Sequence, residues 1–225
     1  MTICNMVSYT PIGGTESGWG LGEFRCTIVG GSATETGSPT FNIDLSALLQ
    51  LAQFQKDMRQ AMKDAFKALG EGCKKLFDVK DENNLKALDK WIDDNLWFQD
   101  LRVVDPGNNS SAFGTNPNTD LAKLLGQSFP IALSSPTVFV GGAFFDPSKA
   151  TGLDKPLPEE TSTGIYQRNT LVHEYNHARY GYDHQQLFAE WKMDQAGYKI
   201  TGDTYKERDA SAQKAINQFI AKDCK

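Results

Sequence analysis

Several signatures of common protein classes are absent from this chain. No apolar run approaches the roughly 20 residues that span a membrane, and the N-terminus lacks the basic start and apolar core of a signal peptide. The glycines of Gly18-Trp-Gly-Leu-Gly22 precede neither Lys-Ser/Thr nor a helical pattern, so they indicate turns and not a phosphate loop. We therefore expect no membrane partner. Secretion or delivery outside the producing cell is expected, and the missing signal peptide leaves a cytoplasmic location open.

Basic residues are too few for a protein whose main partner is nucleic acid. Lys and Arg number 23 against 28 Asp and Glu, a net charge of −5, whereas phosphate binding requires a basic face. The 225 residues, 40% hydrophobic and 23% charged, suit one soluble globular domain. Because no repeat or linker interrupts them, we predict a single, monomeric domain over 1–225, with a Gly/Ser/Thr-rich β arm at 1–43 and the core at 44–225.

Cysteine is scarce, and no two cysteines have the C-x-x-C spacing of a zinc knuckle or a redox motif. An even count with long spacings favours disulfides in a secreted protein and buried thiols in a cytosolic one. One of the three ways to pair them joins Cys4 to Cys26 and Cys73 to Cys224.

Histidine is scarcer still, and its distribution is the most informative feature of the chain. All three histidines, His173, His177 and His184, lie within twelve residues, and the first two form H-E-x-x-H with Glu174. On a helix, residues four apart project from the same face, so both imidazoles point at one spot. Two nitrogen ligands and an adjacent carboxylate base are what a zinc hydrolase requires.

A zinc site needs a third protein ligand. Gly181 is predicted to end the motif helix and to turn the chain back. His184, three residues beyond this glycine, is the preferred ligand because it is an imidazole. The alternatives, in order of preference, are Asp183, Glu190 with Asp194, and Tyr182.

Hydrophobic periodicity predicts a helical N-terminal part followed by a small mixed sheet and further helices, an α+β fold. The predicted helices are 44–69, 82–97, 164–179 with the H-E-x-x-H motif, 184–196 and 205–222. Strands are predicted at 101–104 and 137–145, and loops at 105–120 and 146–163.

The run 137–145 is the strongest strand candidate. Its double glycine indicates a bulge or a close approach by another backbone. In zinc peptidases an edge strand beside the metal pairs with the extended substrate. We assign this role to 137–145, with an interior strand as the alternative.

Three patches of the sequence resemble the aspzincins, the group of deuterolysins and lysine-specific metalloendopeptidases. They are Val138-Phe-Val-Gly-Gly-Ala-Phe-Phe145, Thr170-Leu-Val-His-Glu-Tyr-Asn-His177 and Gly181-Tyr-Asp-His184. The order of elements agrees over roughly 44–190, and the resemblance implies a zincin-like metallopeptidase domain.

The chain departs from the aspzincin pattern after the glycine. That group has Gly-Thr-x-Asp-x-x-Tyr, with aspartate as third ligand, where this chain has His184 and Leu187. Gly-x-x-His is instead similar to the metzincin consensus H-E-x-x-H-x-x-G-x-x-H, with one extra residue before the glycine. The missing aspartate and tyrosine weaken the case for the group's lysine preference.

Together these patterns predict a zinc-dependent metalloendopeptidase acting on protein or peptide substrates. The three histidines hold Zn²⁺, and Glu174 takes a proton from the metal-activated water and passes it to the leaving amine. Tyr180, Tyr182 and Tyr198 are candidate donors to the developing oxyanion. The alternatives are a zinc-binding module without proteolytic activity, and a toxin or effector protease with one narrow target.

Overall fold

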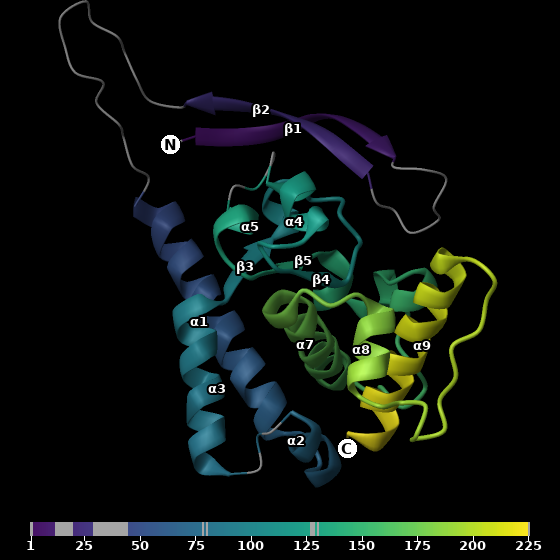
Figure 1. The fold of residues 1–225 in the computed structure, drawn as a ribbon. Coiled ribbons are helices and arrows are strands. Elements are labelled where there is room, and N and C mark those ends of the chain that lie inside the picture. The colour runs from purple at the N-terminus through teal and green to yellow at the C-terminus, as the bar shows by residue number, and fades with distance from the viewer. Residues whose placement is uncertain are drawn as a thin grey trace, which may run out of the picture.

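Helices surround a small three-stranded sheet in the computed structural model, which describes residues 2–11, 20–28, 45–77, 79, 81–126, 129 and 131–224 (Figure 1). The fold is α+β, as predicted. In chain order the strands and α-helices are β1 (Thr2–Pro11), β2 (Gly20–Ile28), α1 (Leu45–Lys67), α2 (Glu71–Leu76), α3 (Glu82–Asn95), β3 (Trp97–Asp100), β4 (Ala112–Thr115), α4 (Asp120–Leu125), α5 (Ile131–Ser134), β5 (Thr137–Val140), α6 (Gly142–Phe145), α7 (Thr163–Tyr180), α8 (His184–Glu190) and α9 (Tyr205–Asp223). The 3-10 helices are η1 (Leu101–Val103), η2 (Pro147–Lys149) and η3 (Gly152–Asp154). None of the helices described has both the length and the apolarity of a membrane span.

The long helices lie where periodicity predicts them, and polar caps begin α3, α7 and α9. Asp81 accepts a hydrogen bond from the backbone N–H of Asn84 at the start of α3, and Thr204 forms a capping box with Glu207 at the start of α9. The predicted helix 184–196 is too long, because α8 ends at Glu190. Two residues later Lys192 has φ of 51°, a left-handed conformation that a helix cannot contain.

The sheet has the order β3-β5-β4, with β3 parallel and β4 antiparallel to β5. The edge-strand role predicted for 137–145 is therefore wrong: Thr137–Val140 is the central strand, fully buried, and Gly142–Phe145 is helical. The strand predicted at 101–104 lies at Trp97–Asp100 instead, and the predicted loop 105–120 contains β4. Its sequence, Ala-Phe-Gly-Thr, has no polar–apolar alternation because all four residues are buried.

The two edges of the sheet are covered differently. Gln55 of α1 bonds both backbone groups of Phe98, with its Nε2 2.5 Å from the carbonyl oxygen and its Oε1 3.0 Å from the N–H, so it closes the β3 edge. At the other edge, the N–H of Gly114 in β4 donates to the Glu174 carboxylate of α7 at 2.7 Å. The edge strand beside the motif helix is therefore β4.

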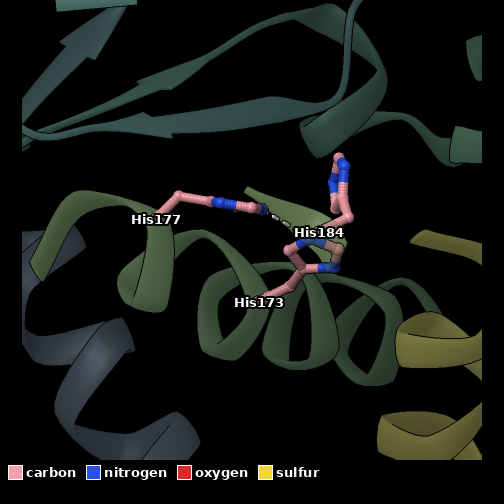
Figure 2. A group of neighbouring side chains, drawn as sticks. All are labelled: His173, His177 and His184. Carbon is pink, nitrogen blue, oxygen red and sulfur yellow. Dashed lines mark hydrogen bonds between the residues drawn. The ribbon is translucent and has the colours of Figure 1, made fainter. Parts of the chain in front are cut away.

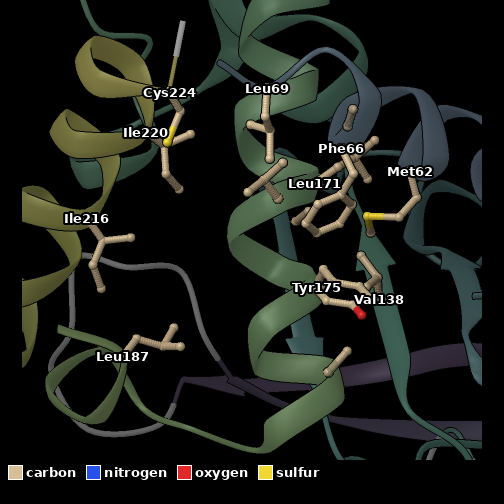
Figure 3. Close-up of a cluster of buried hydrophobic side chains, with 14 of the residues drawn as sticks. Met62, Phe66, Leu69, Val138, Leu171, Tyr175, Leu187, Ile216, Ile220 and Cys224 are labelled. Carbon is tan, nitrogen blue, oxygen red and sulfur yellow. The ribbon is translucent and has the colours of Figure 1, made fainter. Parts of the chain in front are cut away.

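One hydrophobic core joins the helices to the sheet, with α7 at its centre (Figure 3). The helices α1 and α3 lie on one side of α7, and α8 and α9 lie on the other (Figure 1). Leu171 and Tyr175 of α7 are buried against Met62 and Phe66 of α1 and Val138 of β5. The motif helix is thus held by packing on both flanks.

The double glycine at 141–142 is a close backbone approach, as the sequence suggested. A Cβ on Gly141 would lie 2.4 Å from the carbonyl oxygen of Ser110, and one on Gly142 would lie 2.5 Å from that of Asn108. These contacts fix the segment that leads into β4.

A buried disulfide joins Cys73 of α2 to Cys224 after α9, which confirms this predicted pair. A link of 151 residues in sequence separation restricts the unfolded chain by about 5 kcal/mol in the loop-entropy picture. At the N-terminus, β1 and β2 form the predicted hairpin, with Cys4 opposite Cys26 in register. The predicted disulfide between Cys4 and Cys26 involves side chains that lie outside the described part of the structure.

Gly114→Ala tests the contact between β4 and α7. The new Cβ would lie 2.0 Å from the carbonyl oxygen of Glu174 and 2.9 Å from the N–H nitrogen of Ala178, both backbone atoms. We expect the free energy of unfolding in urea to fall by about 3 kcal/mol or more. The control Gly164→Ala, in the first turn of α7, meets no atom within 4 Å and should be neutral or stabilising. Equal stability of the two variants would contradict this packing.

Candidate metal centre

The motif helix begins and ends at capped positions. The Ser162 hydroxyl oxygen accepts a hydrogen bond from the N–H of Ile165, and Gly181 ends the helix in the left-handed conformation, φ 70°, with its N–H donating to the carbonyl oxygen of His177. Asn116, just after β4, donates to the last carbonyls, those of Ala178 and Arg179, at 3.0 Å each. This end of α7 is therefore fixed to the sheet.

The turn after Gly181 brings the third histidine back to the helix. Asp183 caps α8 by accepting from the N–H of Gln186 at 2.7 Å, and the Gln186 side chain bonds the Asp183 N–H in return. His184 is consequently the first residue of α8, opposite the face of α7 that carries His173 and His177.

The three histidines converge (Figure 2). One ring nitrogen from each lies within 4.8 Å of the others, and the Nε2 atoms of His173 and His177 are 2.9 Å apart. This group could hold a metal ion.

Each imidazole is fixed through its other nitrogen by an acceptor. Nδ1 of His173 lies 2.7 Å from Oδ1 of Asn217, Nδ1 of His177 lies 2.5 Å from the Tyr182 carbonyl oxygen, and Nδ1 of His184 lies 2.9 Å from Oδ2 of Asp209. Because all three partners are oxygens that accept, each Nδ1 carries the proton and each Nε2 keeps its lone pair. Two lone pairs facing each other at 2.9 Å repel unless a cation lies between them.

Burial keeps the imidazoles in the neutral form that binds metal. It lowers the pKa of His173 well below its usual value, and the charges of the neighbouring histidines lower it further. Burial likewise lowers the pKa of His177 to about 3. At neutral pH these two rings are therefore unprotonated.

Glu174 lies beside the histidines, not among the ligand atoms. Its side chain is buried, and the Gly114 N–H donates to Oε2, which leaves Oε1 without this bond. Burial raises the pKa of Glu174 well above its usual value, the Gly114 hydrogen bond opposes the rise, and the charge of Asp154 adds to it. A carboxylate with a raised pKa is suited to taking and returning a proton near neutrality.

A small polar cavity of about 30 Å³ adjoins His173 and Glu174. Four segments enclose it: the start of β4, residues 153–160, α7 and α9. Asp154 lines it, and burial raises the pKa of this carboxyl, although the hydrogen bond from the Ser111 N–H and the charge of His184 act against the rise.

The remaining candidate ligands lie elsewhere. Asp183 is engaged as the cap of α8 and also accepts from the Tyr205 hydroxyl at 2.8 Å. Glu190 and Asp194 are exposed. Tyr182 contributes its backbone carbonyl oxygen, which orients His177.

Tyr180 and Tyr198, two of the candidate oxyanion donors, contact residues other than the three histidines. Tyr180 is 48% exposed and stacks on Tyr182 with ring centroids 5.6 Å apart. The Tyr198 hydroxyl donates to Asp223 at 2.7 Å, six residues beyond Asn217 on α9, which is about 9 Å of helix. Their assignment as oxyanion donors stays a prediction.

Asp209, Asn217 and Gly114 are the site residues that the sequence analysis missed. The first two lie on one helix, α9, and none of the three belongs to a motif at recognisable spacing. Only the eight-residue interval between Asp209 and Asn217, which places both near one side of a helix, pointed to them.

No family model, curated protein or solved structure matches this chain.

Asp209→Asn should weaken metal binding without unfolding the chain. The amide keeps one acceptor for His184 Nδ1 but loses the charge that favours the Nδ1–H tautomer, so we expect the metal affinity to fall 10- to 100-fold. Competition with a chromophoric chelator measures this. Asp223→Asn, on the same helix but bonded to Tyr198, should leave the affinity unchanged; a similar loss in both variants would refute the assignment.

In the metal-free protein, the neutral His173 and His177 should lower the stability on mild acidification, against an opposing contribution from the raised pKa of Glu174. The folded state holds His177 at a pKa of about 3 and His173 also below its usual value, whereas the unfolded chain regains about 6.5. Below about pH 6.5 the unfolded state binds more protons, so the free energy of unfolding falls by about 1.4 kcal/mol per pH unit for each such histidine. Urea titrations with chelator present check this. His177→Gln should flatten the dependence, and an unchanged slope would argue against the buried neutral ring.

Proposed function

We propose that this protein is a zinc-dependent metallopeptidase, with His173, His177 and His184 as zinc ligands and Glu174 as the base. The observation that carries the proposal is the convergence of three imidazole lone pairs beside a buried carboxylate. Three histidines with an adjacent acid that is not a ligand are typical of catalytic zinc sites.

The donor types fit zinc. Nitrogens bound about 2.0–2.1 Å from one tetrahedral ion stand roughly 3.3 Å apart. The Nε2 atoms of His173 and His177 are 2.9 Å apart, and the wider separations in the group, up to 4.8 Å, would shorten on binding. Three protein nitrogens leave a fourth position for water or substrate. When bound, zinc supplies Lewis-acid polarisation and makes a bound water molecule more acidic.

The chain's own residues supply the proton transfers. Glu174 is held at Oε2 by the Gly114 N–H, and Oε1 accepts the proton of the attacking water and then returns it to the leaving amine. Asn217 and Asp209 keep the His173 and His184 rings oriented, with the protons on Nδ1.

The β4 edge supports a peptide as substrate. Because the Gly114 N–H points at Glu174 and not at β5, the backbone groups of Ala112, two residues earlier, also point away from β5. An extended peptide that paired with this edge would pass beside Glu174. We include in this proposal the zincin-like fold and the resemblance to aspzincins. The buried disulfide between Cys73 and Cys224 supports secretion or delivery into an oxidising compartment.

Glu174→Gln is the central test of the proposed activity. It removes the base but no ligand, so zinc content should stay at one per chain while cleavage of a peptide library falls at least about 10²-fold. Glu71→Gln, an exposed acid of α2, serves as the matched control. Full cleavage by Glu174→Gln would sink the base assignment, and a wild type that binds zinc but cleaves nothing would favour the non-proteolytic module.

His184→Ala tests the third ligand. It should lose zinc and cleavage together, whereas Asp183→Ala, which removes a helix cap worth about 1 kcal/mol, should keep both. The metal content of the purified variants decides the matter, and the reverse pattern would transfer the ligand role to Asp183.

A further inference from the structure

The segment Thr151–Glu160, called the strap below, forms one wall of the cavity beside Glu174. Its residues Leu153, Asp154, Lys155, Leu157 and Glu160 line the cavity together with His173 and Glu174. A volume of about 30 Å³ has room for about two water molecules. Pockets that hold small organic ligands measure about 300–1,000 Å³, so this cavity is too small for a peptide while the strap lies in this position.

The strap also lies against the substrate edge of the sheet. Ser111 and Ala112, at the start of β4, line the same cavity as Asp154 of the strap. The Tyr166 hydroxyl lies 2.6 Å from Ser111 Oγ and 3.1 Å from the carbonyl oxygen of Asp154, so it ties the strap to the edge. A peptide that added to this edge would need the space of the strap.

The strap is attached by hydrogen bonds and by an ion pair of Glu159 with Lys222 of α9 at 3.6 Å, and not by core packing. None of its residues is buried, and η3 is its only helical turn. Glu160 accepts from Leu157 N–H and from Asn169 Nδ2, each at 2.8 Å, and Asn217 Nδ2 lies 3.4 Å from the carbonyl oxygen of Leu153. Segments with few buried contacts open at low free-energy cost.

The buried residues nearest the strap are Ala150, immediately before it and 6% exposed, and Tyr166 of α7, six residues after it and 3% exposed. Residues 161–164, between the strap and Tyr166, are exposed. Within the strap, Gly152 has φ of 57°, a left-handed conformation that glycine adopts without strain. A weakly held segment between two buried anchor residues can open as a unit.

We propose that the strap is a lid that closes the Glu174 side of the metal centre and must leave the β4 edge before a peptide can bind. The inference rests on the proposed function, because it concerns access to the same site. Tyr166 is the latch, since its hydroxyl contacts both the strap and the strand. Asn217 joins the closed lid to the metal centre, because its Oδ1 holds His173 and its Nδ2 faces Leu153.

Tyr166→Phe tests the latch in the full zinc-loaded chain, and stopped-flow binding of a tetrapeptide hydroxamate is the measurement. In the wild type, the association rate should level off with concentration at the rate of lid opening. The variant should raise this limit about tenfold, which corresponds to about 1.4 kcal/mol, or one neutral hydrogen bond. Ser148→Ala, which loses a hydroxyl in the preceding loop outside the cavity, is the control and should match the wild type.

Acetohydroxamate carries the same metal-binding group without the peptide. Its association rate should change less than about twofold between wild type and Tyr166→Phe. A tenfold change for both ligands would mean an altered metal centre and would overturn the lid. So would an unchanged limit for the tetrapeptide hydroxamate.

Hydrogen exchange tests the lid independently of zinc and of activity. The amides of Asp154, Leu157 and Glu160 should exchange about tenfold faster in Tyr166→Phe than in wild type or Ser148→Ala. Glu160→Gln, which weakens a different attachment, should act in the same direction. Equal exchange in all four proteins would overturn the lid even if zinc binds and peptides are cleaved. Absence of zinc or cleavage in the wild type would contradict only the proposed function.

Discussion

Three imidazole lone pairs directed at one another inside the protein are the arrangement on which the site depends. Such an arrangement is unfavourable by itself, and it persists because each Nδ1–H is held by an oxygen that cannot donate: Asn217, Asp209 and the carbonyl of Tyr182. The rings cannot turn to relieve the repulsion without losing these bonds in a buried, poorly solvated place. This arrangement suits a cation. The helix α9 supplies Asn217 and Asp209, which orient the rings of His173 and His184.

The second constraint is the contact of β4 with α7. Gly114 brings a strand so close to the helix that a single methyl group would overlap the Glu174 carbonyl oxygen. This approach lets a strand N–H reach the Glu174 carboxylate and places the β4 edge of the sheet beside the histidine cluster. The contact of Gly114 with α7 thus sets both the position of the Glu174 carboxylate and the direction of the β4 edge. The strap fills the remaining space beside Glu174.

Helix periodicity and capping residues predicted the long helices well, because α1, α3, α7 and α9 each bury one or more apolar faces of ordinary spacing. The strands were predicted poorly. The strands β4 and β5 are four residues long and buried on both faces, so alternation carries no signal in them, and Thr137–Val140 looks the same whether it is central or at an edge. Whether a strand is central or at an edge depends on which strands pair with it, and the sequence does not show this pairing. The strand β4 was missed because it lies in a stretch whose Asn, Ser, Gly and Pro content indicates a loop.

The amino-acid sequence by itself determined the three imidazoles, the acid between them and the glycine that turns the chain toward His184, because helical spacing and a left-handed stop are local properties. Only the tertiary structure decided which nitrogen of the His173 and His184 rings faces the centre. That choice is made by Asn217 and Asp209, which stand 44 and 25 positions along the chain from the histidines they hold. The same is true of Gly114 on Glu174 and of Tyr166 on the strap, since contacts between distant segments follow from how helices and sheet pack and not from local spacing.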